Sequence, residues 1–308
     1  MERPKPWVQR TIISDRLKHA VCGATAGCVA AVVTCPLDVV KTRLQYQRLL
    51  DPRIIPYKGT WGTLCRIWSE EGLRGLYRGL GPTVIGYLPT WAIYFTTYEN
   101  GKQWLREHPI HVTAAMTAGG VSSCITNPIW VVKTRFMIQN NTTLYRYAHT
   151  LDAFRTILTQ EGWKGLYRGL GSSLLGVTHV AVQFPLYERL RVVFKPMEQE
   201  YPGVAHILGA SAMAKMTASC VTYPHEVIRT RLQTQSTNPP QYHGILDAIR
   251  VIYREEGWKA FYKGLSTNLI RTVPSSVLLI LTYELLTQNW NYASTSPPLE
   301  GSRGRGKQ

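Results

Sequence analysis

One short segment occurs three times in this chain, and the spacing of its copies constrains the fold more than any other feature of the sequence. Each copy begins with Pro and ends with a basic residue, Thr and Arg, and the copies cover residues 36–43, 128–135 and 224–231. A Glu-Gly pair and an aromatic-basic-Gly triplet follow every copy, with the triplets at 77–79, 167–169 and 262–264. The leading prolines lie 92 and 96 residues apart, which is too long for a helical solenoid repeat. The sequence therefore predicts a triplicated domain.

Long uncharged stretches recur in step with these repeats. Four of them, at 20–37, 79–98, 108–132 and 169–187, contain no Asp, Glu, Lys or Arg. Two more, at 204–224 and 265–283, are each interrupted by a single base, Lys215 or Arg271. All are long enough to cross a hydrocarbon core of ~30 Å as helices. We therefore expect an all-α membrane protein with six transmembrane helices, two per repeat, and both termini on the same side. Six buried helices of a soluble bundle are the alternative.

The segments between these spans indicate how the repeats are divided. Residues 64–68, 154–158 and 249–253 mix apolar and basic side chains, which predicts short amphipathic helices at the membrane interface. The repeats are expected at 15–106, 107–196 and 203–290. Residues 291–308 contain Ser, Pro, Gly and Arg but few apolar side chains, so a disordered tail is predicted there.

The charge balance points to an anionic partner. Lys and Arg number 35 against 19 acidic residues, for a formal charge of +16. Nucleic acid, anionic lipid and acidic small molecules all fit such a balance. The bases recur beside apolar segments in every repeat instead of gathering in one patch or tail. That distribution favours lipid and an anionic solute over nucleic acid.

Motifs of enzymes and metal proteins are not found. The six cysteines show no C-x-x-C spacing, which indicates reduced thiols and neither a disulfide nor a metal site. The phosphate-binding pattern G-x-x-x-x-G-K-[ST] is absent, so transport driven by nucleoside triphosphate hydrolysis is not expected. We predict that the protein is not an enzyme and has no resident cofactor.

The repeated motifs resemble those of the mitochondrial carrier family, and the resemblance runs from about residue 15 to residue 290. The family pattern is Pro-x-acid-x-x-base, then an acidic-Gly pair and an aromatic-basic-Gly triplet. This resemblance implies six transmembrane helices in three pseudo-symmetric repeats, with short amphipathic helices on the matrix side. It also implies a monomer in the mitochondrial inner membrane, with both termini toward the intermembrane space and transport by alternating access.

A first set of charged residues is implied to close the matrix side of the carrier. The acid of one repeat is expected to reach the base of the next, because Asp38 and Lys41 share a helical face. The expected contacts are Asp38 with Lys133, Glu226 with Lys41, and Arg229 over the ring of Trp130, which replaces the third acid. Gln45 and Gln233 match the family's bracing glutamines. Interfacial charges without a gating role are the alternative.

A second set is implied to close the opposite, cytoplasmic side. The even-numbered spans end in an aromatic-acid-x-x-base pattern whose third copy has Thr287 in place of the base. The residues implied are Tyr98, Glu99, Lys102, Tyr187, Glu188, Arg191, Tyr283 and Glu284.

A third set is implied to contact the transported solute near the middle of the membrane. Counting back from the three glutamates of the cytoplasmic set gives three levels: Gly86, Leu175 and Arg271; Tyr87, Gly176 and Thr272; Thr90, His179 and Ser275. A base at membrane depth is unfavourable unless it faces water or a ligand, so Lys215 and Arg271 are expected to hold phosphate. The aromatic rings of Tyr87 and Trp91 could stack on a nucleobase of the solute. A purely structural role is the alternative for each of these side chains.

Glycines and bases near helix N-termini are implied to bind cardiolipin. Free N–H groups at such ends bind phosphate readily. The residues implied are Gly59, Arg78, Gly79, Arg168, Gly169, Gly244, Lys263 and Gly264.

The Pro-Ile-Trp at 128–130 resembles the branch of the family that transports NAD⁺, flavin or folate, and pyrimidine nucleotides. Within that branch, the stretches 86–91 and 222–226 most resemble NAD⁺ carriers. The expected function is antiport of NAD⁺ against AMP or ADP. A pyrimidine nucleotide or FAD/folate carrier is the alternative within the branch, and a membrane scaffold or proton leak is the alternative of another class.

Overall fold

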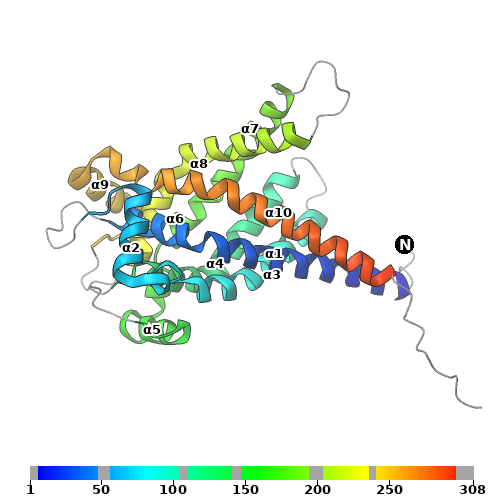
Figure 1. Cartoon of the computed structure of the whole chain (residues 1–308), viewed down its shortest axis with the longest axis horizontal. Helices are drawn as coiled ribbons and strands as arrows, with labels where there is room; N and C mark the ends of the chain where they lie inside the picture. Colours follow the sequence, from blue (N-terminus) through cyan, green and yellow to red (C-terminus); the bar gives the residue numbers. More distant parts are fainter. Residues whose placement is uncertain are drawn as a thin grey trace, which may run out of the picture.

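The protein is helical throughout the part of the chain that the structure describes (Figure 1). The computed structural model describes residues 6–47, 56–104, 110–140, 147–193, 204–235 and 241–295. The long helices are α1 (Pro6–Tyr46), α3 (Leu80–Trp104), α4 (Ile110–Ile138), α8 (Val204–Thr234) and α10 (Leu265–Thr295). The shorter ones are α2 (Gly59–Leu76), α5 (Thr150–Leu166), α6 (Leu170–Leu175), α7 (Thr178–Val193), α9 (Ile245–Glu256) and the 3-10 helix η1 (Trp258–Tyr262). The predicted all-α class is confirmed.

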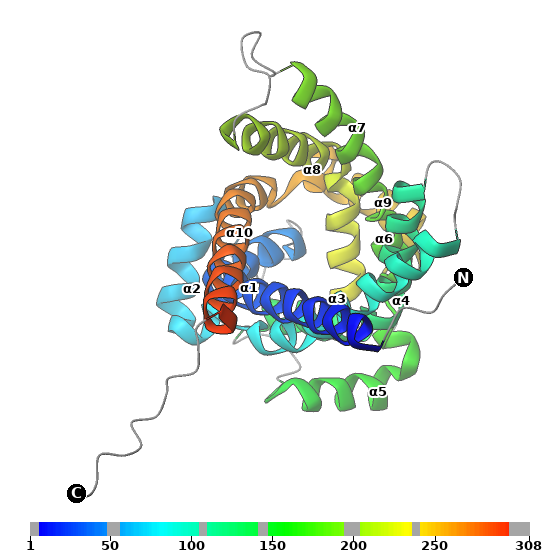
Figure 2. The same cartoon turned by 90° about the vertical axis from the view of Figure 1, so that its right-hand side faces the viewer.

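The three repeats meet through pairs of helices. α3 packs along α4, α7 along α8, and α10 along α1, so each repeat ends against the beginning of the next. Figure 2 shows the long helices around a central space, and Figure 1 shows α2, α5 and α9 gathered at one end. This closed ring has the threefold arrangement that the repeated sequence predicts.

Two predicted segments differ from the observed helices. The stretch 169–187 is divided between α6 and α7, because Gly176 turns the chain and its N–H bonds to the carbonyls of Ser172 and Ser173. The ring of His225 packs against this glycine, where a β-carbon would lie only 3.1 Å from Nε2. In addition, α10 continues to Thr295, so residues 291–295 are helical, not part of a tail. The rest of the predicted tail lies outside the described residues.

The apolar length of the helices gives partial support for membrane spans. Among the described residues, Val21–Tyr46 and Trp258–Asn289 are long and apolar enough to cross a membrane by length and composition. Buried helices of soluble proteins can pass the same test, so this observation is weak by itself. The six-span arrangement stays an expectation.

The glycine of each Glu-Gly pair ends the regular part of a short helix. Gly72, Gly162 and Gly257 have φ of 63°, 67° and 73°. Residues with a β-carbon rarely adopt this left-handed backbone, whereas glycine adopts it without steric penalty. The recurrence of glycine after the glutamate therefore has a local structural cause.

A buried Arg–Glu pair joins each of α1, α4 and α8, which are the odd-numbered helices among the six expected spans, to the short helix that follows it. The pairs are Arg43–Glu71 at 2.5 and 3.0 Å, Arg135–Glu161 at 2.5 and 2.9 Å, and Arg231–Glu256 at 2.5 and 3.0 Å. Each contact is bidentate, which matches the planar fork of a guanidinium group to a carboxylate. The arginine ends the repeated segment and the glutamate belongs to the Glu-Gly pair. The recurrence of both motifs is thus explained by one interaction.

The same guanidinium groups also bind the backbone of a neighbouring repeat. Arg43 donates to the carbonyls of Met137 and Gln139, Arg135 to those of Gln233 and Gln235, and Arg231 to those of Gln45 and Gln47. Carbonyls at the C-terminal end of a helix have no partner within that helix. Each arginine therefore satisfies the end of another repeat's helix while it holds its own short helix in place.

Substituting Glu71 by Gln should destabilise the protein far more than substituting its neighbour Glu70. The Glu71 side chain is 2% exposed and bound by Arg43 and Arg78, whereas the Glu70 side chain is 47% exposed and pairs with Arg66 on the same helix. Removing one partner of a buried pair costs about 3–5 kcal/mol, against about 0.3–0.5 kcal/mol for an exposed helical pair. Thermal unfolding of the purified variants measures the difference, and equal shifts in melting temperature would contradict the assigned role.

Lowering the pH should weaken the ion pairs that Glu256 forms with Arg231 and Lys263. Burial by itself raises the pKa of the Glu256 carboxyl, but hydrogen bonds and charges from Arg231 and Lys263 outweigh burial and hold the pKa below its ordinary value of 4.5. Such a carboxyl stabilises the fold above its ordinary pKa, and the stabilisation is lost as the pH falls through the folded-state pKa. The melting temperature should therefore fall between about pH 5 and about pH 3, and less steeply in Glu256→Gln. Parallel curves would refute this prediction.

Candidate functional site

A polar cavity of about 520 Å³ lies among the long helices. Helices α1, α3, α4, α6, α7, α8 and α10 all contribute to its lining. Its charged lining residues are Asp38, Lys41, Lys133, Glu226, Arg229 and Arg271. Four of these six side chains are basic, so the cavity has an excess of positive charge and suits an anionic solute.

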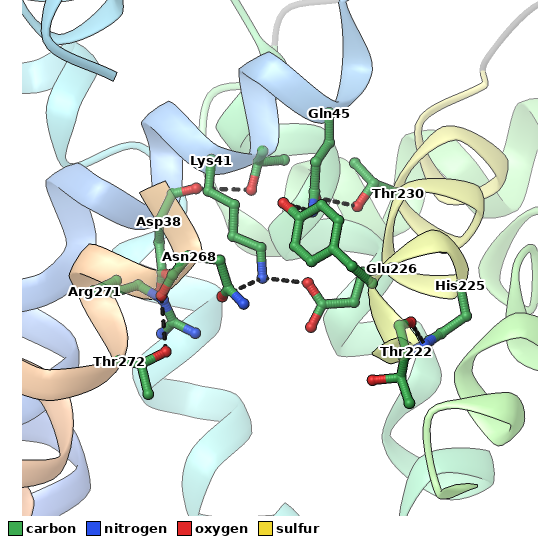
Figure 3. Close-up of polar contacts among 12 residues, drawn as sticks. Asp38, Lys41, Gln45, Thr222, His225, Glu226, Thr230, Asn268, Arg271 and Thr272 are labelled. Carbon is green, nitrogen blue, oxygen red and sulfur yellow. Dashed lines mark hydrogen bonds and ion pairs between the residues drawn. The ribbon is translucent and has the colours of Figure 1, made fainter. Parts of the chain in front are cut away.

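Ion pairs between the repeats cross one end of this cavity, which we call its floor. Figure 3 shows the pair of Lys41 with Glu226. Lys41 Nζ lies 2.6 Å from the Glu226 carboxylate and also donates to Asn268 Oδ1 at 2.9 Å. Lys133 Nζ lies 3.8 Å from the Asp38 carboxylate. Both predicted pairs between acid and base are therefore present, and they join α1 to α8 and α4 to α1. Their role as a gate stays a prediction.

Arg271 takes part in the same network, which differs from the expectation of an isolated cation. Its Nε lies 3.0 Å from Asp38 Oδ1, although the N–H does not align as a hydrogen bond. Asp38 is consequently shared between Arg271 on one side and Lys133 on the other. The sharing arises because α10 packs along α1 and brings its base to the carboxylate of the first repeat.

The predicted contact between Arg229 and Trp130 is replaced by a different one. The cation over the Trp130 ring is Lys133, whose Nζ lies 4.9 Å from the ring centroid. Lys133 is three residues after Trp130 on α4 and therefore lies over the same helical face. The indole is held by a hydrogen bond from Nε1 to Thr126 Oγ1 at 3.1 Å and by an edge contact with Tyr87.

The two predicted bracing glutamines both line the cavity but have different partners. Gln45 donates to the hydroxyl of Tyr223 at 2.9 Å and accepts from Thr230 at 2.8 Å. Gln233 accepts from Thr134 at 3.0 Å. Neither amide bonds to an ion pair, so both glutamines connect neighbouring odd helices without bracing the charges.

Only part of the predicted solute-contact set lines the cavity. Tyr87, Gly176, His179 and Arg271 do so. The structure does not bring the remaining seven into the lining: Gly86, Thr90, Trp91, Leu175, Lys215, Thr272 and Ser275. The predicted stacking pair is also divided, because Tyr87 meets Trp130 whereas Trp91 is 38% exposed and meets Tyr94.

Local contacts explain several of these positions. A β-carbon at Gly86 would lie 3.0 Å from the side chain of Ile129, so this glycine allows α3 and α4 to approach closely. The hydroxyls of Thr90 and Thr272 bond back to their own helices. Lys215 Nζ donates to Ser276 Oγ at 3.3 Å, and none of the ion pairs among the described residues includes it. Solute contact at these positions stays a prediction.

Two histidines in the lining present hydrogen-bond acceptors. The Thr222 hydroxyl donates to the Ala218 carbonyl at 2.8 Å, so it accepts from His179 Nδ1 at 3.0 Å. The Thr222 carbonyl can only accept, so His225 Nδ1 also donates. In both neutral rings Nε2 is then the acceptor nitrogen, and at His179 the Gln183 side chain also bonds to the ring. Sequence reasoning missed His225, and its one signal was a polar residue where the other repeats have Leu37 and Ile129.

The opposite end of the ring carries the cytoplasmic set. The side chains of Glu99 and Lys102 lie outside the described residues. Glu188, Arg191 and Glu284 are exposed, and no ion pair among the described residues includes them. Tyr98 stacks on Tyr94 with ring centroids 6.1 Å apart. One end of the cavity is therefore bridged by charge, and at the other end the described residues form no such bridge.

The bases of the predicted lipid set bind protein groups instead of projecting freely. Arg78 lies 3.1 Å from Glu71, Arg168 lies 3.0 Å from Glu161, and Lys263 pairs with Glu256. Gly79, Gly169 and Gly264 have positive φ and are packed against the glutamine or methionine at the end of an odd helix. Gly59 and Gly244 have open space around them at the N-termini of α2 and α9.

The two ion pairs on the cavity floor should differ in strength. The Lys41–Glu226 contact is 2.6 Å, whereas the Lys133–Asp38 contact is 3.8 Å and its carboxylate is shared with Arg271. Coulomb attraction falls with distance. A double-mutant cycle with Lys41→Met and Glu226→Gln should give a coupling energy about 1 kcal/mol larger than one with Lys133→Met and Asp38→Asn. Thermal unfolding measures both cycles, and a reversed order would contradict the geometry.

The helical repeats form a ring around a basic cavity, and ion pairs bridge one end of that cavity. This architecture is that of a solute transporter. The chain belongs to the mitochondrial carrier family. The family model, described as "Mitochondrial carrier protein", matches residues 14–109, 107–198 and 201–293. It is accordingly a transporter and not an enzyme, as the sequence predicts.

Relatives within the family support a nucleotide solute. The chain is 44% identical over 305 residues, 94% of its length and 81% of the relative's, to "Mitochondrial nicotinamide adenine dinucleotide transporter 1" of Saccharomyces cerevisiae. It is 43% identical, over 89% of its length and 80% of the relative's, to "Nicotinamide adenine dinucleotide transporter 2, mitochondrial" of Arabidopsis thaliana. It is 34% identical, over 88% of its length and 94% of the relative's, to human "Solute carrier family 25 member 33". The family indicates a mitochondrial membrane protein, and two of these three relatives are named as transporters of a dinucleotide.

Proposed function

We propose that the protein exchanges NAD⁺ for an adenine nucleotide, such as AMP or ADP, across the mitochondrial inner membrane. The observation that carries the proposal is the excess of basic side chains in a cavity of about 520 Å³, in a chain 43–44% identical to relatives named as NAD transporters. NAD⁺ and its exchange partner both carry phosphate, which basic side chains bind. A pyrimidine nucleotide or FAD/folate is the alternative solute.

The helices supply a consistent membrane arrangement. Six spans would be formed by α1, α3, α4, the α6–α7 pair, α8 and α10, with both termini toward the intermembrane space. The bridged end of the cavity, where α2, α5 and α9 gather, then faces the matrix (Figure 1). The charged residues of the opposite end would pair when the floor opens, which gives alternating access.

The cavity groups offer a binding mode for the solute. A phosphate group near Arg271 competes with Asp38 for the guanidinium, which loosens the floor when substrate arrives. Tyr87 offers an aromatic ring, and Nε2 of His179 and of His225 can accept from the amide of nicotinamide or the amino group of adenine. Lys215 stays a candidate for a second phosphate contact at another stage of transport.

Lipid is proposed to bind at the short helices. Free N–H groups at the N-termini of α2 and α9, beside Gly59 and Gly244, suit the phosphates of cardiolipin. We further propose that the protein acts as a monomer, because the ring encloses the cavity within one chain.

Uptake by reconstituted protein tests the assignment. Liposomes that contain AMP or ADP should take up labelled NAD⁺ faster than liposomes without internal nucleotide. External FAD, folate and UTP should compete poorly. Exchange of UTP or FAD without NAD⁺ would move the assignment to another solute of the branch. Proton leak with no solute exchange would instead favour the alternative of another class.

Removing the guanidinium of Arg271 should reduce exchange strongly. A hydrogen bond to a charged group contributes about 1.5–3 kcal/mol, so Arg271→Ala should lower kcat/KM for NAD⁺ about 10- to 100-fold. Arg271→Lys should lose less because the charge is kept. Arg250→Ala, at an exposed arginine of α9, is the matched control. Wild-type rates in Arg271→Ala would contradict phosphate binding at this residue.

A further inference from the structure

One base of the cavity lining, Arg229, is attracted by Glu226 but is held by no direct polar contact among the described residues. Arg229 lines the cavity, and among the described residues it makes no hydrogen bond or ion pair. The two carboxylates of the floor are already engaged, Glu226 by Lys41 at 2.6 Å and Asp38 by Arg271 at 3.0 Å. The place where the repeat motif would supply a third carboxylate is occupied by Trp130. The floor therefore has an unmatched guanidinium beside an uncharged ring.

A second donor without an acceptor lies one helical turn further along α8. Gln233 is 2% exposed, and its Nε2 has no partner among the described residues. The matching Gln45 donates from Nε2 to the Tyr223 hydroxyl at 2.9 Å. At the position that corresponds to Tyr223, α4 carries Asn127, whose amide donates to the Leu166 carbonyl. The departures from threefold symmetry at Trp130 and Asn127 thus leave donors unpaired on one side of the cavity.

A second cation, Lys133, lies close to this place and is weakly held. Lys133 lies over the Trp130 ring and is 3.8 Å from Asp38, beyond the usual length of a charged hydrogen bond. Lys133 and Arg229 are near enough to repel each other. Such a pair of cations is stabilised when an anion comes between them.

The geometry points to an anion subsite at Arg229 and Gln233, in which a phosphate group of the solute takes the place of the carboxylate that Trp130 replaces. The guanidinium contributes a planar pair of donors to the phosphate oxygens, and Lys133 turns toward the same group and away from Asp38. The ligand class is a phosphate monoester or a pyrophosphate. Its identity as part of a nucleotide rests on the proposed function, whereas anion binding itself does not.

Binding to the purified full-length protein in detergent tests the subsite with three probes: AMP, inorganic pyrophosphate and adenosine. Arg229→Gln should raise the Kd for AMP and pyrophosphate about 10- to 100-fold and leave that for adenosine within about twofold. Trp130→Glu should weaken the binding of both anions to a similar extent although Arg229 is kept, because the new carboxylate pairs with the Arg229 guanidinium. It should also raise the melting temperature without ligand. Arg250→Ala, at an exposed arginine of α9, is the matched control and should bind as the wild type does.

The outcomes separate this inference from the transport proposal. Wild-type affinity for pyrophosphate and AMP in either Arg229→Gln or Trp130→Glu overturns the subsite, even if the protein exchanges NAD⁺. Loss of anion binding in both variants supports the subsite, even if the exchanged nucleotide is not NAD⁺. If pyrophosphate binds but AMP does not, the site holds free inorganic anion and the role in solute recognition is wrong.

Discussion

The buried Arg–Glu pairs are the interaction on which the remaining structure depends. Each guanidinium binds the glutamate of its own repeat and the last carbonyls of a helix in another repeat. The three repeats are thereby joined into one ring at a single end. Because two partners are satisfied at once, replacing either charge leaves a buried group unpaired. The ring holds the odd helices close enough for the charges above it to meet across the cavity.

Function depends on how the floor departs from this symmetry. A perfectly repeated floor would have three equivalent ion pairs, but Trp130 removes one carboxylate and Arg271 adds one guanidinium. Positive charge therefore exceeds negative charge at the place that a solute reaches last. Under the proposed function, fewer pairs would make the floor easier to open, and the excess of base would favour an anion during opening. The symmetric residues hold the fold, and we propose that the asymmetric ones select the solute.

The helical class and the triplication could be predicted from stretches and motifs that recur at fixed spacing, whereas the two floor pairs were implied by the resemblance to the carrier family. The pairing of Arg271 with Asp38 could not be predicted, since it depends on how α10 is rotated against α1. The contact of Lys133 with Trp130 was also missed, because reasoning from repeats favoured partners on different helices. His225 interrupts no pattern except the apolar character of one position, so only the structure shows it in the cavity.

The central claim is that a cavity within this ring is reached from one side of the membrane at a time. Ser123 lines the cavity and can be changed to Cys in a variant whose six native cysteines are replaced. A membrane-impermeant thiol reagent, applied in turn to each face of reconstituted vesicles without substrate, measures access to this position. The account predicts rapid modification from the intermembrane-space face and none from the matrix face. Equal modification from both faces would contradict it.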